Sequence, residues 1–256
     1  MKAVFLGTGT SHGVPMIGCS CFVCSSGDPR NHRRRTGLYV VANGMHLIFD
    51  TSPEFRLQAI DNRVERVDAV FLTHNHADHI FGFDDIRRYC ALQGCCIPTY
   101  GSPETMADMR LKFDYAQKPS YAVNAVPRVD FIDLTEPVEL GGVCITPLPV
   151  RHGQGLINAY RVDDGTRTLV YAPDCNGIPA ETLTLIGQPD VMILDALRPK
   201  AHQTHFSTEE SVAMLQQIGA KRSFVTHLTH DNEHTALQAA LPDGIEVPYD
   251  GLAIQL

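Results

Sequence analysis

Three histidines and one aspartate fall within a single short stretch of this chain, Thr73-His74-Asn75-His76-Ala77-Asp78-His79. Imidazole and carboxylate groups are common protein ligands of zinc and manganese, and a polar turn alone explains such a cluster poorly. His74 and His76 are two positions apart, so extended backbone would place both rings on one side, where they could hold one metal. Asp78 and His79 follow where the chain begins to turn. We therefore expect them to serve a second metal beside the first.

Close thiols form a second cluster, with Cys19, Cys21 and Cys24 inside six positions. In a chain whose thiols stay reduced, this spacing indicates a metal site rather than a disulfide. A tetrahedral zinc needs a fourth ligand. His230 is the candidate, because it stands one short loop beyond His227. The cluster predicts a structural zinc, and the remaining cysteines are interpreted as packed or free thiols.

The elements that must position these groups are short apolar strands, each followed closely by a histidine or an aspartate. In chain order the residues at the strand ends are Asp50, His74, His152, Asp174, Asp195 and His227. One such case would mean little, because a buried strand has to end at a polar residue. Six cases limited to two residue types predict one common site, held firmly by the sheet behind it.

Helical patterns lie between the strands, over residues 53–60 and 84–92 and after Ser207. Ser207 and Glu210 have the spacing of a capping box, and Gly219 is the expected end of that helix. Glycine-containing turns are expected at 141–142, 163–165 and 176–177. Hairpins that alternate with helices predict a mixed α/β sandwich. Without a linker or a repeat, residues 1–256 are expected to form a single domain.

Composition and charge narrow the possible functions. The chain has 256 residues and a formal net charge of −8, which disfavours broad nucleic-acid binding. It lacks an apolar run of about 18 residues, so we expect no membrane span. The first ten residues are typical of a strand rather than a signal peptide, and this favours a cytoplasmic location. The basic run at 30–35 is more typical of a solvated loop than of a phosphate site.

The ordered ligand motif resembles the metallo-β-lactamase superfamily over nearly the whole chain. The resemblance implies an αββα four-layer sandwich with two catalytic divalent metals, zinc or manganese, at one edge. Two adjacent metals can share a hydroxide and polarise a phosphoryl oxygen. By resemblance, the first metal is held by His74, His76 and His152, the second by Asp78, His79 and His227, while Asp174 bridges them and Asp50 orients the cluster.

The Cys triplet, the segment 226–230 and the opening segment 7–15 are together similar to the cyclic phosphodiesterases of the carbon–phosphorus lyase pathway. Those enzymes open a ribosyl 1,2-cyclic phosphate. The resemblance implies that His205 protonates the leaving alkoxide and that Asp195 orients it, with Asp78 also counted among the catalytic residues. His202 competes for the acid role, and His205 is preferred for its fixed distance from the helix start. A small phosphodiester substrate and a homodimer are the implied partners.

Three rival functions remain. A tRNA 3′-end endonuclease of the same superfamily would use a long Gly/Pro-rich arm, and the stretch 101–137 is too short and too mixed for one. A thioester or other small-ester hydrolase would share the same motifs, because metals serve carbonyl and phosphoryl chemistry alike. A non-enzymatic protein with a degenerate site would need a broken ligand set, whereas all seven ligand positions are filled here.

Overall fold

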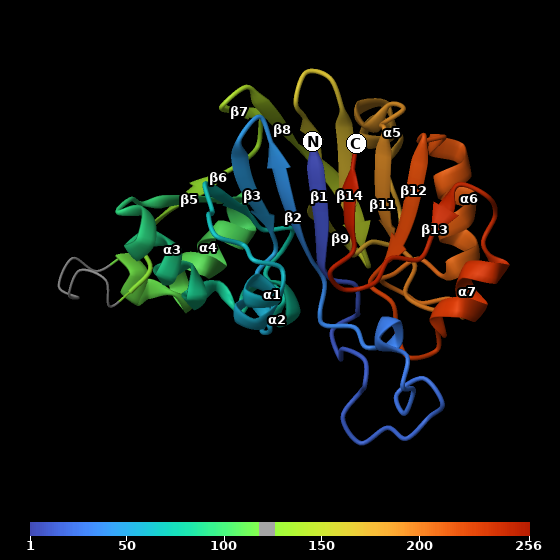
Figure 1. Cartoon of the computed structure of the whole chain (residues 1–256). Helices are drawn as coiled ribbons and strands as arrows, with labels where there is room; N and C mark the ends of the chain where they lie inside the picture. Colours follow the sequence, from blue (N-terminus) through green and yellow to red (C-terminus); the bar gives the residue numbers. More distant parts are fainter. Residues whose placement is uncertain (118–125) are drawn as a thin grey trace.

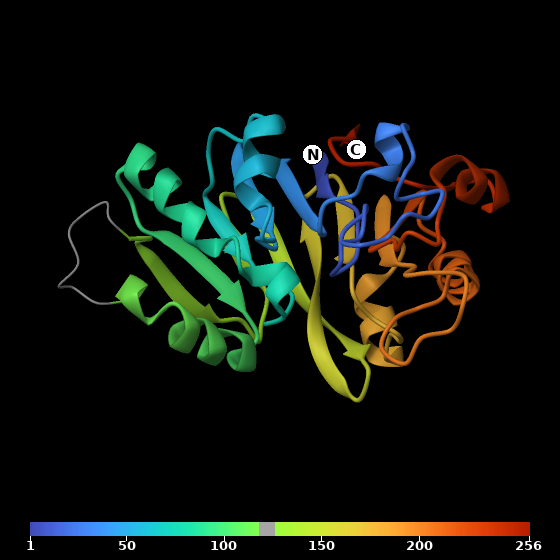
Figure 2. The same ribbon diagram turned by 90° about the horizontal axis from the view of Figure 1, so that it is seen from below.

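Two seven-stranded sheets lie face to face in the computed structural model, which describes residues 1–117 and 126–256 (Figures 1 and 2). The first has the order β14-β1-β2-β3-β4-β5-β6, with β1 (Lys2–Gly7), β2 (Gly37–Ala42), β3 (Met45–Phe49), β4 (Ala69–Phe71), β5 (Ile97–Gly101), β6 (Val129–Asp133) and β14 (Ala253–Gln255). The second has the order β13-β12-β11-β10-β9-β8-β7, with β7 (Val138–Leu140), β8 (Val143–His152), β9 (Gly155–Asp163), β10 (Thr168–Ala172), β11 (Val191–Asp195), β12 (Arg222–Thr226) and β13 (Ile245–Glu246).

The core between the sheets follows from the two-residue period of a strand. Successive side chains point to opposite faces, so Phe49 faces the second sheet while Ile48 faces the outer helices. The ring of Phe49 stacks on that of Phe71 in β4, with the ring centroids 5.2 Å apart. The ring of Tyr160 in β9 packs against both, with centroid distances of 5.5–5.6 Å. Aromatic residues from both sheets thus fill one shared inner layer.

Helices cover the two outer faces, so that the layers run helix, sheet, sheet, helix (Figure 1). The first sheet is flanked by α1 (Phe55–Asp61), the short α2 (Ala77–Ile80), α3 (Ile86–Gln93) and α4 (Pro103–Lys112), and the second by α5 (Ala180–Ile186), α6 (Thr208–Ile218) and α7 (His234–Ala240). Three 3₁₀ turns complete the described elements: η1 (Pro29–Asn31), η2 (Phe83–Asp85) and η3 (Asp114–Gln117). The predicted αββα sandwich is confirmed.

The helix ends test the local predictions. Ser207 and Glu210 form the predicted capping box, and Gly219 ends α6 in the left-handed conformation at φ +67°. The helix expected over 53–60 begins only at Phe55, and the one expected over 84–92 begins as the 3₁₀ turn η2. At the turn predicted for 176–177 the chain bends at Asn176, and the backbone of Gly177 pairs with that of Arg151 in an isolated antiparallel bridge.

Two further expectations concern longer segments. In the stretch 101–137 the structure describes α4, η3 and β6, whereas residues 118–125 lie outside the described residues. The expectation that this stretch forms no long arm is therefore tested only in part. Among the described helices none has both the length and the apolarity that crossing a bilayer would require.

Strand direction brings the predicted site residues to one edge. Strands β10, β11 and β12 are parallel, and β8 runs the same way because two antiparallel steps separate it from β10. In the first sheet β1, β3 and β4 are likewise parallel to one another. The loop after β1, residues 8–36, leaves from this same edge and projects below the sheets in Figure 1.

Candidate metal centre

The strand ends converge on three overlapping groups of potential ligands, and two of these groups contain the seven residues predicted from the sequence. The first contains His74, His76, His152 and Asp174, and the second contains Asp78, His79, Asp174 and His227, with the ligand atoms of each group within 4.8 Å of one another. Asp174 belongs to both groups, and its side chain is almost fully buried. The structure therefore brings together all seven residues predicted as catalytic metal ligands, with the predicted bridge in the middle.

The distances inside the first group fit one ion. His74 Nε2 lies 2.8 Å from His76 Nδ1 and 3.4 Å from Asp174 Oδ2. His152 Nδ1 lies 3.2 Å from Asp174 Oδ1. Two nitrogen ligands of a tetrahedral zinc, each at about 2.0–2.1 Å from the metal, are separated by about 3.3 Å. The four residues are thus spaced as ligands that share a cation.

The carboxylate of Asp50 fixes the orientation of His79. Asp50 Oδ2 lies 2.8 Å from His79 Nδ1, and an ionised carboxylate can only accept, so Nδ1 donates. The opposite nitrogen, Nε2, is then the one available to a metal, and it lies 3.2 Å from Asp174 Oδ2 and 3.3 Å from Asp78 Oδ2. Asp50 occupies the place that its predicted orienting role requires.

Thr73 is a site residue that the sequence analysis missed. Its Oγ1 lies 3.0 Å from each carboxylate oxygen of Asp50 and 3.0 Å from His74 Nδ1. The hydroxyl donates to the carboxylate and accepts from His74, which leaves His74 Nε2 free to bind a metal. Its position directly before the histidine cluster was the one signal available in the sequence.

The buried charged groups of the centre also fit divalent cations. His79 Nε2 and both ring nitrogens of His227 are buried and make no hydrogen bond to the described residues. Burial raises the pKa of Asp174, but the neighbouring His227, His205 and His79 outweigh this and hold it well below its usual value. Burial lowers the pKa of His79, yet the carboxylates of Asp50, Asp78 and Asp174 hold it well above its usual value. The buried carboxylates and imidazoles of the centre thus form a set of ligands whose charge bound divalent cations would compensate.

His205 contacts the centre from the loop between β11 and α6. Its Nδ1 lies 2.8 Å from Asp195 Oδ2 and 2.7 Å from Asp174 Oδ1. Burial lowers the pKa of His205, but hydrogen bonds to Asp174 and Asp195 outweigh it and raise the pKa to about 10. Asp195 is fully buried and also accepts a hydrogen bond from the Cys175 backbone at 2.9 Å. His202, the competitor, is exposed, so the geometry favours His205.

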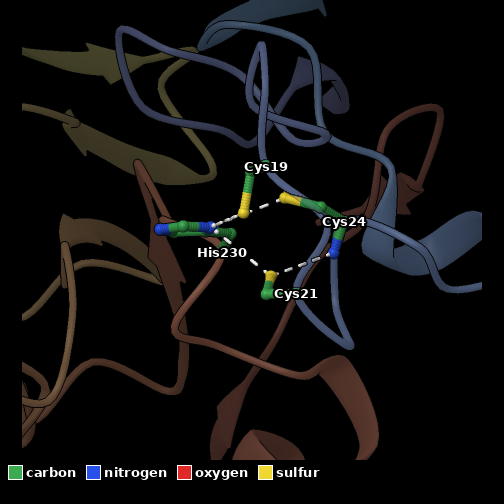
Figure 3. Close-up of side chains that lie close together, drawn as sticks. All are labelled: Cys19, Cys21, Cys24 and His230. Carbon is green, nitrogen blue, oxygen red and sulfur yellow. Dashed lines mark hydrogen bonds between the residues drawn. The ribbon is translucent and has the colours of Figure 1, made fainter.

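The three cysteines of the cluster lie next to His230, as predicted (Figure 3). His230 Nδ1 lies 3.2 Å from Cys19 Sγ and 3.5 Å from the sulfur atoms of Cys21 and Cys24. A tetrahedral zinc with a sulfur and a nitrogen ligand separates the two by about 3.5 Å. A hydrogen bond from the Cys24 backbone lowers the pKa of Cys21 to about 6, which favours the thiolate that a metal binds. The four residues fit a closed structural zinc site.

Comparison with known proteins identifies the class. Residues 46–228 match the family described as beta-lactamase superfamily domain, so the chain belongs to that superfamily. With its buried His/Asp cluster it is a metal-dependent hydrolase of the metallo-β-lactamase fold.

Particular relatives cover most of this chain. A crystal structure of a new diphosphatase from the PhnP family is 35% identical, with a TM-score of 0.91 over 100% of this chain and 97% of that one. An octanoyltransferase of Porphyromonas gingivalis is 31% identical over 98% of this chain, which spans only 51% of that protein. Zn²⁺-bound PqqB from Methylobacterium extorquens is 21% identical over 100% of both chains, with a TM-score of 0.78, a likeness of fold alone.

Proposed function

We propose that this protein is a dinuclear-metal phosphodiesterase that hydrolyses a small phosphodiester such as a ribosyl 1,2-cyclic phosphate. The observation that carries the proposal is the carboxylate of Asp174, which is shared by two ligand groups and contacts His205 at 2.7 Å. The 35% identity to a protein described as a diphosphatase supports it. Diphosphates and cyclic phosphates both require the cleavage of a P–O bond at a charged phosphoryl centre.

The chain's own residues prepare the site for such chemistry. Two divalent cations, when bound, would polarise the phosphoryl oxygens and lower the pKa of a water molecule. Asp50 and Thr73 hold His79 and His74 with their Nε2 atoms facing the centre. Asp174 supplies one negative charge to both ligand groups. These five side chains thus hold the ligand atoms in place before the substrate arrives.

His205 is suited to protonate the leaving group. Because carboxylates only accept, its Nδ1 donates to Asp195 and Asp174, and Nε2 is the nitrogen that can give a proton outward. The oxygen of water forms a bond to phosphorus and releases one proton to solvent, the bond to the leaving oxygen breaks, and that oxygen takes the proton of Nε2. Asp195 stabilises the charged imidazole in the ground state and keeps it oriented.

The test is turnover on protein whose metal content has been measured. The substrate panel contains cyclic phosphates, a nucleoside diphosphate, tRNA and a thioester, each assayed after reconstitution with zinc or with manganese. We expect about three metals per chain when all three ligand groups are filled, and turnover of the small phosphodiesters. Turnover of the thioester alone would contradict the proposal, and a count of two without zinc on the cysteines would remove the structural site.

The tRNA endonuclease alternative makes a different prediction. Human tRNase Z, short form, shares the fold at 18% identity, which supports nothing beyond the fold. The net charge of −8 opposes a large polyanion. Filter binding with tRNA at moderate salt distinguishes the small-substrate phosphodiesterase from the tRNA endonuclease. Retention of tRNA by the protein, together with cleavage at the 3′ end, would favour the endonuclease. Homodimerisation stays a prediction, to be checked by analytical ultracentrifugation.

A further inference from the structure

A groove with a volume of about 340 Å³ lies between α1 and α3, in the helix layer that covers the outer face of the first sheet (Figure 1). This volume is within the range of small-molecule sites, about 300–1,000 Å³. The buried residues of the lining form the floor: Phe55, Ala59, Val64 and Tyr89. The other lining residues reach the surface: Arg56, Ile60, Asp85, Arg88 and Leu92. The groove shares no residue with the metal groups, so its ligand need not be the substrate.

The two helices that form the groove run in the same direction. Strands β3 and β4 are parallel, and α1 and α3 follow them on the same outer face. Burial and Asp84 raise the pKa of Asp85 at the start of α3, and Arg56 at the start of α1 acts against this, so the two starts lie close together. Farther along, the hydroxyl of Tyr89 in α3 donates to the carbonyl of Val64, just beyond α1, at 2.8 Å. Residues at similar positions along the two helices therefore face each other across the groove.

The two walls of the groove carry the same pair of residue types in the same order. Arg56 and Ile60 are four positions apart in α1, and Arg88 and Leu92 are four positions apart in α3. Residues with this spacing lie on one face of a helix, one turn apart. Because both arginines are in the first turn of their helix, the groove has a cationic end and an apolar end.

Two unpaired cations stand at the first of these ends. The side chains of Arg56 and Arg88 are exposed and make no hydrogen bond or ion pair with residues 1–117 and 126–256. Asp85 is the one carboxylate among the described lining residues, so this end has an excess of positive charge in a chain of net charge −8. The N-terminus of a helix disfavours cations, because the helix dipole is positive there. Helix stability therefore does not explain the two arginines.

The other end of the groove has apolar walls that remain in contact with water. Ile60 is 58% exposed and Leu92 is 56% exposed, although both border a floor that is buried. An alkyl chain between these walls would remove apolar surface from water on both partners, which is favourable. A ligand that fits the groove is thus anionic at one end and apolar along the rest of its length.

We propose that this groove binds a medium-chain fatty acid, with its carboxylate at the two arginines and its alkyl chain between Ile60 and Leu92. A guanidinium presents a planar fork of donors that matches the two oxygens of a carboxylate. A helix of a partner protein is about 10–12 Å across with its side chains, which is too wide for this volume. A membrane surface would need a broad apolar patch, whereas these walls face each other. This binding function is separate from hydrolysis.

Calorimetric titration at pH 8 with decanoate and with decanol, both kept below the concentration at which they aggregate, tests the proposal. We expect wild type to bind decanoate at one saturable site per chain. Arg88→Ala should weaken decanoate binding about 3- to 10-fold and change decanol binding less than about twofold, because only the carboxylate contacts the guanidinium. Leu92→Gln should weaken the binding of both ligands about 3- to 10-fold, because both bury the same alkyl chain.

Arg87→Ala and Leu111→Gln are the matched controls, and both should bind the two ligands as wild type does. Arg87 is adjacent to Arg88 in α3, but it pairs with Asp84 at 3.2 Å and lies outside the groove lining. Leu111 is 78% exposed on α4 of the same layer, also outside the lining. Melting temperatures of all four variants show whether a loss of binding reflects the site or the folding of the variant.

Other outcomes would overturn the proposal. Decanoate that does not saturate below about 1 mM would show that the groove is not a fatty-acid site. Equal weakening of decanoate and decanol in Arg88→Ala would remove the carboxylate contact. An acidic amphipathic peptide that displaces decanoate and binds more tightly would assign the groove to a partner protein. Retention on anionic vesicles without binding of free decanoate would assign it to a membrane. None of these measurements uses phosphodiester turnover, so they stand whether or not the proposed function fails.

Discussion

Two of the ligand imidazoles at the centre are oriented by a hydrogen bond on the ring nitrogen opposite the other ligands. His79 Nδ1 donates to Asp50, and His74 Nδ1 donates to the Thr73 hydroxyl. In both rings Nε2 is therefore the nitrogen left to bind a metal. Loss of such a partner commonly weakens metal binding about 10- to 100-fold.

Asp50→Asn should weaken metal binding by that order, about 10- to 100-fold. Asp50 accepts the backbone N–H of Thr73 on Oδ1 and His79 Nδ1 on Oδ2, so an amide nitrogen would face a donor on either side. Competition with a chromophoric chelator measures the affinity. Asp133→Asn, on an exposed carboxylate paired with Arg110, is the control. An unchanged affinity in Asp50→Asn would show that Asp50 does not orient the cluster.

His205→Ala should keep the catalytic metals and lower kcat about 100- to 10,000-fold on substrates with a poor alkoxide leaving group. Bis(p-nitrophenyl) phosphate has an activated leaving group and should lose much less. Metal analysis beside the kinetics is essential, because His205 also groups with Asp174, Asp195 and His227 as potential ligands. Loss of a metal equivalent would make His205 a ligand, and equal losses on both substrates would remove the general-acid role.

At the scale of elements, the loop after β1 and the loop after β12 are joined. Leu228 donates to the carbonyl of Thr8 at 2.9 Å and accepts from Thr10 N at 3.2 Å. Leu228 lies between His227, a predicted catalytic ligand in the left-handed conformation at φ +61°, and His230 of the cysteine cluster. The dinuclear centre and the cysteine cluster therefore share the loop after β12. Disorder at either site should extend to the other through this loop.

Cys21→Ser should lower the occupancy of the dinuclear centre as well as the thermal stability. Loss of the structural zinc would release His230, and with it the loop that holds His227. Metal analysis after dialysis at limiting metal measures occupancy at both sites. Cys144→Ser replaces a thiol that lies outside both metal groups and is the matched control. Full occupancy of the dinuclear centre in Cys21→Ser would show that the two sites are independent.

The stability of the protein around this loop also depends on pH, because His234 at the start of α7 can titrate. Arg33 lies 3.3 Å from His234 Nδ1, and a guanidinium only donates, so this nitrogen is unprotonated. Burial and the adjacent Arg33 and Arg30 lower the pKa of His234 from 6.5 to about 4. As the pH falls, His234 therefore becomes protonated in the unfolded chain before it does so in the folded protein. The stability that neutral His234 contributes is present above pH 6.5 and is lost as the pH falls toward 4.

His234→Asn keeps an acceptor for Arg33 but cannot titrate. Its free energy of unfolding should fall less than that of wild type between pH 6.5 and 4, as urea denaturation across that range would show. Parallel curves for the two proteins would rule out His234 as the titrating group.

At the scale of the whole molecule, the two sheets bring charged residues together that the unfolded chain keeps apart. Bound cations should therefore stabilise the native state by mass action. Chelation at neutral pH should lower Tm by roughly 5–10 °C, if the metals contribute about 3 kcal/mol in a protein of this size. Scanning calorimetry with and without chelator measures this, and re-addition of metal should restore Tm. An unchanged Tm would mean that the metal groups are not coupled to folding.

The sequence could predict which residue types form the site and where they stand on strands. Ligand chemistry depends on residue identity, and strand ends follow from local apolar runs. That information sufficed to name the seven residues that the structure groups around Asp174, Asp50 beside them, and the four residues of the cysteine–histidine cluster; their roles as ligands stay a prediction. It failed at local details such as the start of α1 and the pairing of Gly177, because tertiary contacts set those.

The tertiary structure alone decided what depends on contacts between distant segments. It joined Cys19 to His230 across 211 positions and placed the Thr73 hydroxyl between Asp50 and His74. A threonine has no identifiable role in the sequence, since its role depends on which groups surround it. The sequence by itself thus determined which ligand types form the centre, and the fold decided their orientation and their neighbours.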